Sequence, residues 1–125
     1  MSIPKELLYT KEHEWLNNEE DYVTIGITSY AQGQLGDIIF LELPDIGDKL
    51  TAGQPFGEIE AVKTVSDLFA PITGTVIEVN DSLDDSPDKI NHDCYGEGWI
   101  IKIKPDERIE KDNLLDYQAY TKLIE

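Results

Sequence analysis

The sequence predicts a mostly β protein in which two similar β halves pack face to face and a helix ends the chain. Residues 22–27 alternate small or polar side chains with Val23, Ile25 and Ile27, which is the period of a strand. Three segments of the first half also recur in the same order in the second, which favours two related sheets packed on each other. The matches pair residues 36–41 with 74–79, 48–50 with 88–90, and 57–59 with 98–100.

The first helix is expected directly after the strand at residues 22–27. Ser29 is predicted to be its N-cap, because Gln32 three residues later completes a capping box. The helix would cover residues 30–35 and end at Gly36, since glycine is the residue type that most often follows a helix.

Further strands are predicted where apolar runs end at turn-forming residues. They are expected at residues 37–43, 55–62, 65–69, 73–79 and 99–103, with polar turns at residues 45–48 and 80–88. The C-terminal helix is expected at about residues 112–124, because Tyr117, Tyr120 and Ile124 fall on one helical face.

Length and charge limit the possible classes. The 125 residues suffice for a single domain, residues 1–125, with a real core. Ten Lys and Arg against 26 Asp and Glu give a formal net charge of −16. Such a surface repels nucleic acid and anionic lipid and suits partners with basic docking faces, although solubility alone is the alternative explanation.

The cellular compartment is predicted from Cys94 and from the apolar runs. A single cysteine cannot form an internal disulfide, which fits a reducing interior. No apolar run is long enough to span a bilayer, and the first residues resemble neither a signal nor a transit peptide. A bacterial cytoplasmic protein is therefore expected; the mitochondrial matrix applies only if a presequence has been removed.

Lys63 is the most distinctive residue of the chain. It is the only basic residue between Lys49 and Lys89, and it lies between the strands expected at residues 55–62 and 65–69. Acidic residues and small or β-branched residues surround it. One amine displayed on an anionic surface suits a lysine selected for modification better than one that binds an anion.

Several blocks of residues around Lys63 and along nearly the whole chain occur together in a characteristic order. The blocks are Tyr9 with His13-Glu14-Trp15, residues 25–28, Ala31-Gln32, residues 35–37, residues 42–44, Gly47, residues 60–63, Ser66-Asp67, Ala70-Pro71, Gly74, Val76, Asn80, Pro87, Ile90-Asn91, Tyr95-Gly96, Gly98-Trp99 and residues 102–104. In these blocks the chain resembles the H-protein family of the glycine cleavage system. The family fold implied by this resemblance is a flattened sandwich of two small sheets, a lipoyl/biotinyl-type barrel-sandwich hybrid with short helices and a C-terminal helix.

The resemblance implies a non-catalytic carrier with lipoate attached covalently to Lys63 at a hairpin tip. Such a carrier receives an aminomethyl group at glycine decarboxylase (P protein) and passes it to the aminomethyltransferase (T protein). It then delivers the dithiol to dihydrolipoyl dehydrogenase (L protein). A lipoyl or octanoyl transferase or ligase would attach the arm, and a monomer that docks transiently is expected.

The resemblance also suggests which neighbours of Lys63 are recognised by the ligase or by partners. Glu58, Glu60, Ala61, Val62 and Thr64 are the candidates. For the two glutamates, a solvated strand face is the alternative. Alanine and threonine at positions 61 and 64 replace the serine and alanine that are common in the family, and both changes keep the side chains small.

A second group of matched positions is implied to line the groove where the loaded arm rests. His13, Glu14 and Asp67 belong to it. A carboxylate there would stabilise a cationic nitrogen through a charge-assisted hydrogen bond. The alternatives are a packed structural histidine and ordinary surface acids.

Other functions remain open to different degrees. A relay that hands lipoate or octanoate to 2-oxoacid dehydrogenase subunits uses the same scaffold, and the sequence does not separate it from glycine cleavage. A biotin carrier usually has methionines beside the lysine, where this chain has Val62 and Thr64. No nucleophile–base set indicates an enzyme, and His92 with Cys94 alone does not make a metal site.

Overall fold

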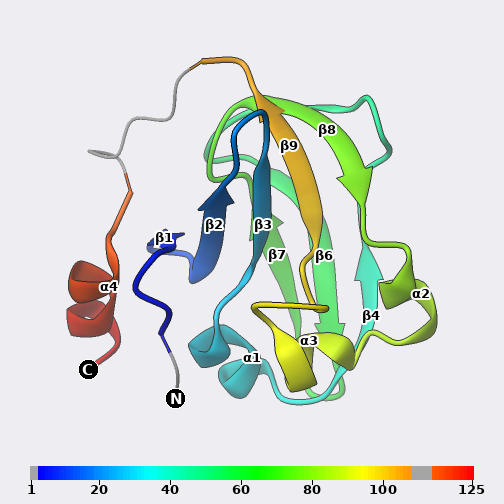
Figure 1. The fold of residues 1–125 in the computed structure, drawn as a ribbon. Helices are drawn as coiled ribbons and strands as arrows, with labels where there is room; N and C mark the ends of the chain where they lie inside the picture. The colour runs from blue at the N-terminus through cyan, green and yellow to red at the C-terminus, as the bar shows by residue number, and fades with distance from the viewer. Residues whose placement is uncertain (1–2, 108–113) are drawn as a thin grey trace.

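The computed structural model describes residues 3–107 and 114–125, which form two antiparallel sheets packed as a sandwich with short helices at its edges (Figure 1). The six-stranded sheet has the order β1-β2-β3-β9-β8-β5, with β1 (Leu8–Tyr9), β2 (Glu14–Asn18), β3 (Val23–Ile27), β9 (Ile101–Pro105), β8 (Gly74–Val79) and β5 (Lys49–Leu50). The three-stranded sheet has the order β4-β6-β7, with β4 (Ile38–Glu42), β6 (Pro55–Ala61) and β7 (Val65–Phe69). The helices are α1 (Ser29–Leu35), α2 (Ser82–Asp85), α3 (Lys89–Asp93) and α4 (Tyr117–Ile124).

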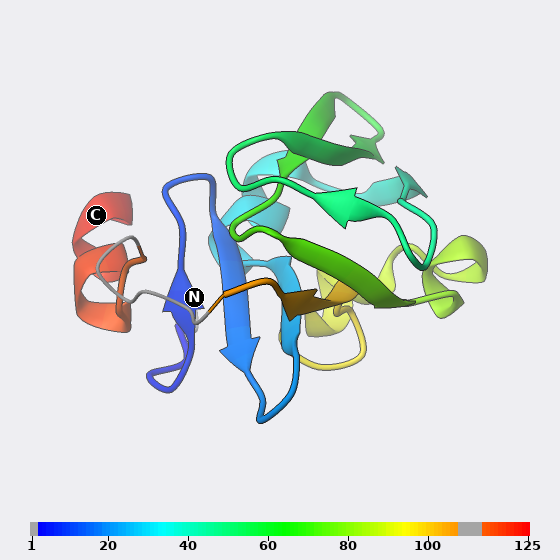
Figure 2. The same cartoon turned by 90° about the horizontal axis from the view of Figure 1, so that it is seen from above.

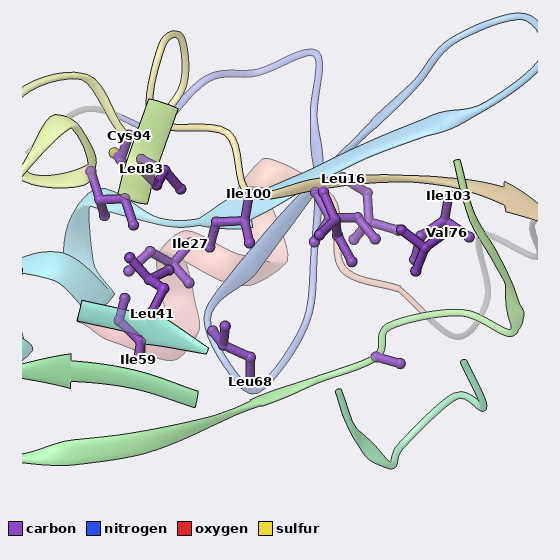
Figure 3. Packing of buried hydrophobic residues seen from close by; sticks show 14 of the residues in the cluster. Leu16, Ile27, Leu41, Ile59, Leu68, Val76, Leu83, Cys94, Ile100 and Ile103 are labelled. Atoms are coloured by element: carbon purple, nitrogen blue, oxygen red, sulfur yellow. The ribbon is translucent and has the colours of Figure 1, made fainter. Parts of the chain in front are cut away.

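This architecture confirms the predicted β sandwich with short helices and a C-terminal helix. Figure 2 shows the two layers from above. Aliphatic side chains fill the space between them, and Leu16, Val76 and Ile103 from the larger sheet belong to the same cluster as Ile59 and Leu68 from the smaller (Figure 3). The burial of this apolar surface is the main stabilising contribution to the fold.

A second cluster of buried side chains holds the C-terminal helix. The ring of Tyr120 stacks on Tyr9 with centroids 4.7 Å apart, and Trp15 and Leu7 complete the cluster. Both views place α4 beside the β1 edge of the larger sheet (Figures 1 and 2). The predicted helical face is therefore correct, but the helix starts at Tyr117 and not near residue 112. Residues 114–116 precede it, and Leu115 instead forms a β-bridge with Tyr9, while residues 112 and 113 lie outside the described part of the chain.

Two local predictions were wrong, the N-cap of α1 and the turn at residues 80–88, whereas the strand expected at residues 22–27 is present as β3. The N-cap of α1 is Thr28, whose hydroxyl accepts a hydrogen bond from the Ala31 amide, and not Ser29. The alternating strand β3 is buried on both faces, because Trp15 covers Gly26: a methyl group placed on this glycine would lie 2.6 Å from the indole ring. The polar segment expected as turn contains α2, and α3 follows it.

The proposed relation between two β halves stays a prediction. Residues 36–41 and 74–79 contribute strands β4 and β8, which lie in different sheets. The second matched pair differs in structure, since Lys49 and Leu50 form β5 whereas Lys89 and Ile90 begin α3. None of the helices in the described ranges is long and apolar enough to cross a lipid bilayer.

Candidate functional site: an exposed lysine and an adjoining groove

Lys63 lies in the tight turn that joins β6 to β7. Glu60 pairs with Val65, and the Ala61 amide donates to the Thr64 carbonyl at 2.8 Å, which leaves Val62 and Lys63 as the two residues of the turn. Both turn residues are exposed, Val62 by 72 %. The two strands predicted on either side of Lys63 are thus confirmed, and the lysine is presented at their tip.

This turn depends on a bond from outside the hairpin. Among the described residues other than glycine only His13 has a positive φ, so the turn is not of the primed types that usually close two-residue hairpins. The absence of Asn-Gly or Asp-Gly around Lys63 agrees with this. Instead, the Val62 amide donates to the Asp37 carbonyl at 3.0 Å and ties the turn to the segment between α1 and β4.

The amine of Lys63 is accessible. Within residues 3–107 and 114–125, Lys63 takes part in no ion pair, and its side chain is exposed. It folds over Gly36, because a methyl group placed on that glycine would lie 3.5 Å from Lys63 Cε and 3.9 Å from Nζ. Gly36 has φ 84° and ψ −152°, a conformation that is essentially restricted to glycine. The lysine is therefore directed towards the C-terminal end of α1.

A groove of about 310 Å³ lies along this helix, between α1, β7 and the start of β2. His13, Glu14 and Asp67, predicted as a group, all line it. The apolar part of its wall is formed by Ile27, Ala31, Leu35, Ile59 and Leu68, and the remaining lining residues are Glu12, Tyr30, Gln34 and Ser66. Leu35 precedes Gly36 in the chain, so the groove begins next to the glycine that Lys63 covers.

Glu14 is a buried carboxyl group at the wall of this groove. Its side chain is 3 % exposed; Oε2 accepts from the Phe69 amide at 2.9 Å and Oε1 from the Thr10 hydroxyl at 3.2 Å. Burial raises the pKa of Glu14 to about 8, although the two hydrogen bonds act in the opposite direction. The alternative of an ordinary surface acid is therefore wrong for Glu14, whereas Asp67 is exposed.

Thr10 organises the turn that carries Glu14, and the sequence analysis missed it. Its hydroxyl accepts from the amides of Glu12 and Glu14 at 3.2 and 3.3 Å, and its carbonyl accepts from the His13 amide at 3.1 Å. His13 has a φ of 69°, which an L residue adopts only when its surroundings enforce it. A threonine hydroxyl that caps amides two and four residues later is a recognisable turn signal.

His13 is both a lining residue and a packed structural one. Its Nδ1 is hydrogen-bonded to the Tyr120 hydroxyl at 2.9 Å, and its ring lies 4.9 Å from that of Tyr30. The same hydroxyl is 2.7 Å from the Oγ1 of Thr28, the N-cap of α1. Burial lowers the pKa of His13, which favours a neutral ring. Tyr120 thereby connects α4 to two sides of the groove.

The pKa of Glu14 makes stability depend on pH. Between about pH 4.5 and pH 8 the folded protein retains a proton that the unfolded chain has lost. Its contribution to the free energy of unfolding is therefore full at low pH and falls as the pH rises, by up to about 1.4 kcal/mol per pH unit. Glu14→Gln removes this contribution, so the stability of the variant relative to the native chain should increase from pH 5 to pH 9.

Urea unfolding at a series of pH values measures this change. Glu20→Gln, at an exposed acid in the β2–β3 hairpin, serves as the control and should follow the native curve. Curves for Glu14→Gln and the native chain that stay parallel across this range would contradict the raised pKa.

The residues predicted for recognition differ in exposure. Val62, Thr64 and Glu58 are exposed, and Glu60 is half-buried. A recognition role does not fit the side chain of Ala61, which is 3 % exposed and packs in the core between the sheets. The backbone of Ala61 instead closes the turn.

A row of carboxylates crosses the outer face of the smaller sheet. Glu58 pairs with Glu42 on one side and with Asp67 on the other, so that three acids of adjacent strands lie directly opposite one another. The next row, nearer Lys63, is Phe40–Glu60–Val65, with both apolar members exposed. Like charges in register destabilise a sheet, so this face is not optimised for stability alone.

Within the described ranges, no three His, Cys, Asp or Glu side chains come together in a way that could hold a metal ion. His92 lies on the exposed side of α3, 3.5 Å from Asp88. Cys94 is buried in the core, and burial raises its pKa to about 11, so the thiol is a core side chain and not a reactive one.

Comparison with known proteins agrees with this geometry. The family model described as glycine cleavage H-protein matches residues 7–125. The glycine cleavage system H protein of Geobacillus kaustophilus is 54 % identical over 99 % of this chain and 98 % of its own length, and that of Bacteroides thetaiotaomicron is 49 % identical over the same shares. The crystal structure of the H protein from Mycobacterium marinum superposes with a TM-score of 0.88 at 40 % identity, covering 96 % of this chain and 97 % of that one.

Proposed function

The chain belongs to the glycine cleavage H-protein family, the lipoyl carriers of the glycine cleavage system, and on this basis we propose that Lys63 is the residue that carries lipoate. The observation that supports this most is that Lys63 is exposed at the tip of a hairpin and forms no ion pair with the described residues. The groove begins next to Gly36, the glycine that the Lys63 side chain covers.

The residues present fit a lipoyl group. A long acyl arm on Nζ removes the charge of the lysine and would extend over Gly36, where there is no side chain to block it. The wall formed by Ile27, Leu35 and Leu68 suits methylene groups. A polar end is available at Glu14, so the groove offers an apolar path followed by a single buried carboxyl group.

When bound, lipoate would supply a disulfide ring that can open to carry the aminomethyl group on one sulfur and can close again when the resulting dithiol is oxidised. The chain would receive this group at glycine decarboxylase, pass it on at the aminomethyltransferase and deliver the dithiol to dihydrolipoyl dehydrogenase. The protein itself contributes tethering, which gives the arm a high effective concentration at each docked active site, and no catalytic turnover of its own.

Glu14 would discriminate between a neutral and a cationic arm. Its raised pKa means that the carboxyl group holds a proton at neutral pH in the absence of a positive neighbour. A cationic nitrogen in the groove favours the ionised form, which accepts a charge-assisted hydrogen bond. Seating of a cation would therefore release the proton from Glu14, and a neutral arm would leave it in place.

The test of the proposed function is the mass of the protein. The chain should be produced in cells supplied with lipoate, and the intact mass should show one lipoyl increment that peptide mapping assigns to Lys63. An unmodified Lys63, or acylation at another lysine instead, would contradict the proposal. A parallel preparation without lipoate provides the unmodified reference.

The acidic face predicts charge-dependent docking of the acylating enzyme. Glu58→Lys should reduce kcat/KM for acylation of Lys63 about tenfold at low salt, with a smaller difference at high salt, because an attractive charge has become repulsive. The same change should raise stability by about 0.2–1 kcal/mol, since it places a cation between Glu42 and Asp67.

Glu20→Lys is the matched control, because it makes the same change in net charge at the β2–β3 hairpin, at the opposite end of the sandwich from the Lys63 turn (Figure 1). Acylation kinetics at two salt concentrations and thermal unfolding measure the two effects. Equal acylation of the Glu58→Lys and Glu20→Lys variants would show that the acidic row is not part of the docking surface.

A further inference from the structure

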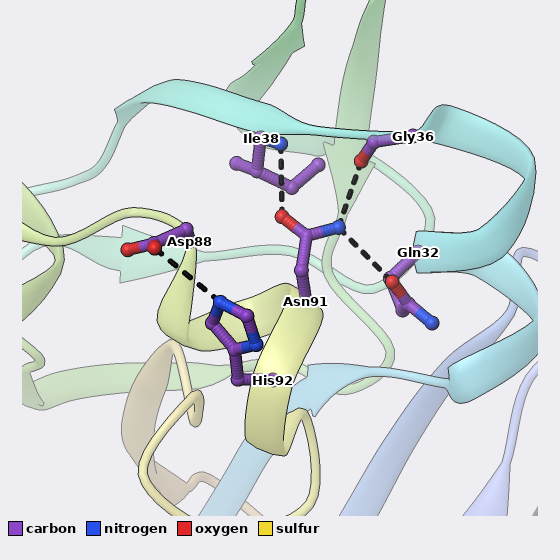
Figure 4. A network of polar contacts seen from close by, with 6 residues as sticks. All are labelled: Gln32, Gly36, Ile38, Asp88, Asn91 and His92. Atoms are coloured by element: carbon purple, nitrogen blue, oxygen red, sulfur yellow. Dashed lines mark hydrogen bonds and ion pairs between the residues drawn. The ribbon is translucent and has the colours of Figure 1, made fainter.

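Asn91 on α3 reaches into the corner where α1 ends and β4 begins (Figure 4). Its Nδ2 donates to the Gly36 carbonyl at 2.8 Å and to Gln32 Oε1 at 3.0 Å. Its Oδ1 accepts from the Ile38 amide at 2.9 Å. A backbone donor and a backbone acceptor thus fix the orientation of the amide, and one side chain bridges two residues of the corner.

The residue enclosed by this bridge is Asp37, and its carbonyl supports the lysine turn. Asn91 holds Gly36 before it and Ile38 after it, while the Asp37 carbonyl accepts from the Val62 amide at 3.0 Å. Gly36 is also the residue over which the Lys63 side chain lies. The corner therefore contacts both the backbone and the side chain of the turn.

The turn needs such external support. Two-residue hairpins are usually defined by glycine or asparagine with positive φ, and Val62 and Lys63 have no such conformation. With weak local preferences, the position of the turn is set by the tertiary bond to Asp37. An acylating enzyme must bring the amine to within about 3–3.5 Å of the acyl carbon, so a shift of the turn changes the reaction rate.

We propose that Asn91 is a positioning residue for lipoyl attachment, which holds the 36–38 corner so that Lys63 is presented to the acylating enzyme in a fixed place. The inference rests on the proposed function, since it requires that Lys63 is the acylated residue. The hydrophobic core holds Asn91 in place, because Ile90, the residue before it on α3, is fully buried. The Asp88–His92 pair in the same view lies on the exposed side of α3 and does not contact the corner (Figure 4).

The experiment compares Asn91→Ala with Asn80→Ala. Asn80 is a matched control: its Nδ2 donates to the carbonyls of Glu97 and Trp99 at 2.8 and 2.6 Å, and its Oδ1 accepts from the Ser82 hydroxyl at 2.6 Å. Both substitutions therefore remove two hydrogen bonds donated by Nδ2 and one accepted by Oδ1. The partners of Asn80 belong neither to α1, nor to β4, nor to the Lys63 turn.

The measured quantity is kcat/KM for acylation of unmodified protein by a lipoate–protein ligase supplied with lipoate and ATP. We expect Asn91→Ala to lower it about tenfold or more. Asn80→Ala should lose thermal stability to a similar extent and be acylated like the native chain. Hydrogen exchange of the Val62 amide should accelerate in Asn91→Ala alone, and a small acylating reagent should modify Lys63 equally in all three proteins because the amine stays exposed.

The outcomes separate this inference from the proposed function. Native-like acylation of Asn91→Ala, or a parallel decrease in both variants, would overturn the positioning role while Lys63 remains the acylated residue. A native chain that is not acylated at Lys63 would overturn both. If Asn91→Ala does not fold, Asn91→Asp replaces it, because a carboxylate keeps the acceptor for the Ile38 amide and loses the donor to the Gly36 carbonyl.

Discussion

Lys63→Arg is expected to abolish lipoyl attachment and glycine cleavage while leaving the fold intact. Arginine keeps the positive charge and the approximate length, but its guanidinium stays protonated and offers no amine to acylate. Lys63 is exposed and outside any ion pair of the described residues, so the free energy of unfolding should change by less than about 0.5 kcal/mol. Intact mass, thermal unfolding and glycine turnover in the reconstituted system measure the three quantities.

Lys122→Arg provides the control, because it makes the same chemical change at another exposed lysine. This variant should be acylated and should support glycine turnover like the native chain. Glycine turnover that persists in the Lys63→Arg variant would mean that the carrier group is attached elsewhere or is not needed.

Gly57→Ala should be among the most destabilising single substitutions in the chain. A methyl group on Gly57 would lie 2.2 Å from the Glu42 carbonyl oxygen and 3.3 Å from its carbon, both backbone atoms of the neighbouring strand. Glu42 pairs with Glu58, the residue after Gly57, so β4 cannot move away from the added methyl group without losing hydrogen bonds to β6. We expect a loss of about 3 kcal/mol or more, which lowers Tm by roughly 10 °C or more.

Gly33→Ala gives the opposite expectation for the same chemical change. This glycine is exposed within α1, and a methyl group there would meet nothing within 4 Å. The substitution should therefore stabilise the protein by about 0.5–1 kcal/mol through helix propensity. Calorimetry of both variants tests the pair. Changes of similar size and the same sign would contradict the packing argument.

The sequence predicted the lysine hairpin well because its signals are local. Two strong strand patterns surround Lys63, and it is the only basic residue between Lys49 and Lys89. The helical face of the C-terminal segment is likewise encoded by the spacing of Tyr117, Tyr120 and Ile124. Where the local structural preference of neighbouring residues agrees with the fold, one sequence is enough to predict the local structure.

The burial of Glu14 could not be predicted from its neighbours. The residues directly before it, Glu12 and His13, are polar, and the amide that binds its carboxyl group belongs to Phe69, 55 positions later. The hydrogen bonds of Asn91 were equally unpredictable, since their partners are 53 to 59 residues earlier in the chain. Pairings at such separations depend on the assembled sandwich and leave no local pattern.

The N-cap of α1 illustrates a smaller limit. Thr28 and Ser29 are both good capping residues, and the presence of Gln32 favoured the second. In the structure the Gln32 side chain donates to the Ser29 carbonyl, and the Thr28 hydroxyl both caps the helix and meets Tyr120. A contact with α4 therefore decided between two adjacent residues of equal local preference.

The hydroxyl of Tyr120 has a mechanical consequence. One oxygen atom joins the last helix to the ring of His13 and to the beginning of α1, which stand on two sides of the same hollow. A bound protein that pulls α4 away from the sheet would act on both sides of the groove through this hydroxyl, and would also have to break the stack of Tyr120 on Tyr9. Helix α4 therefore supports two sides of the groove beside Lys63.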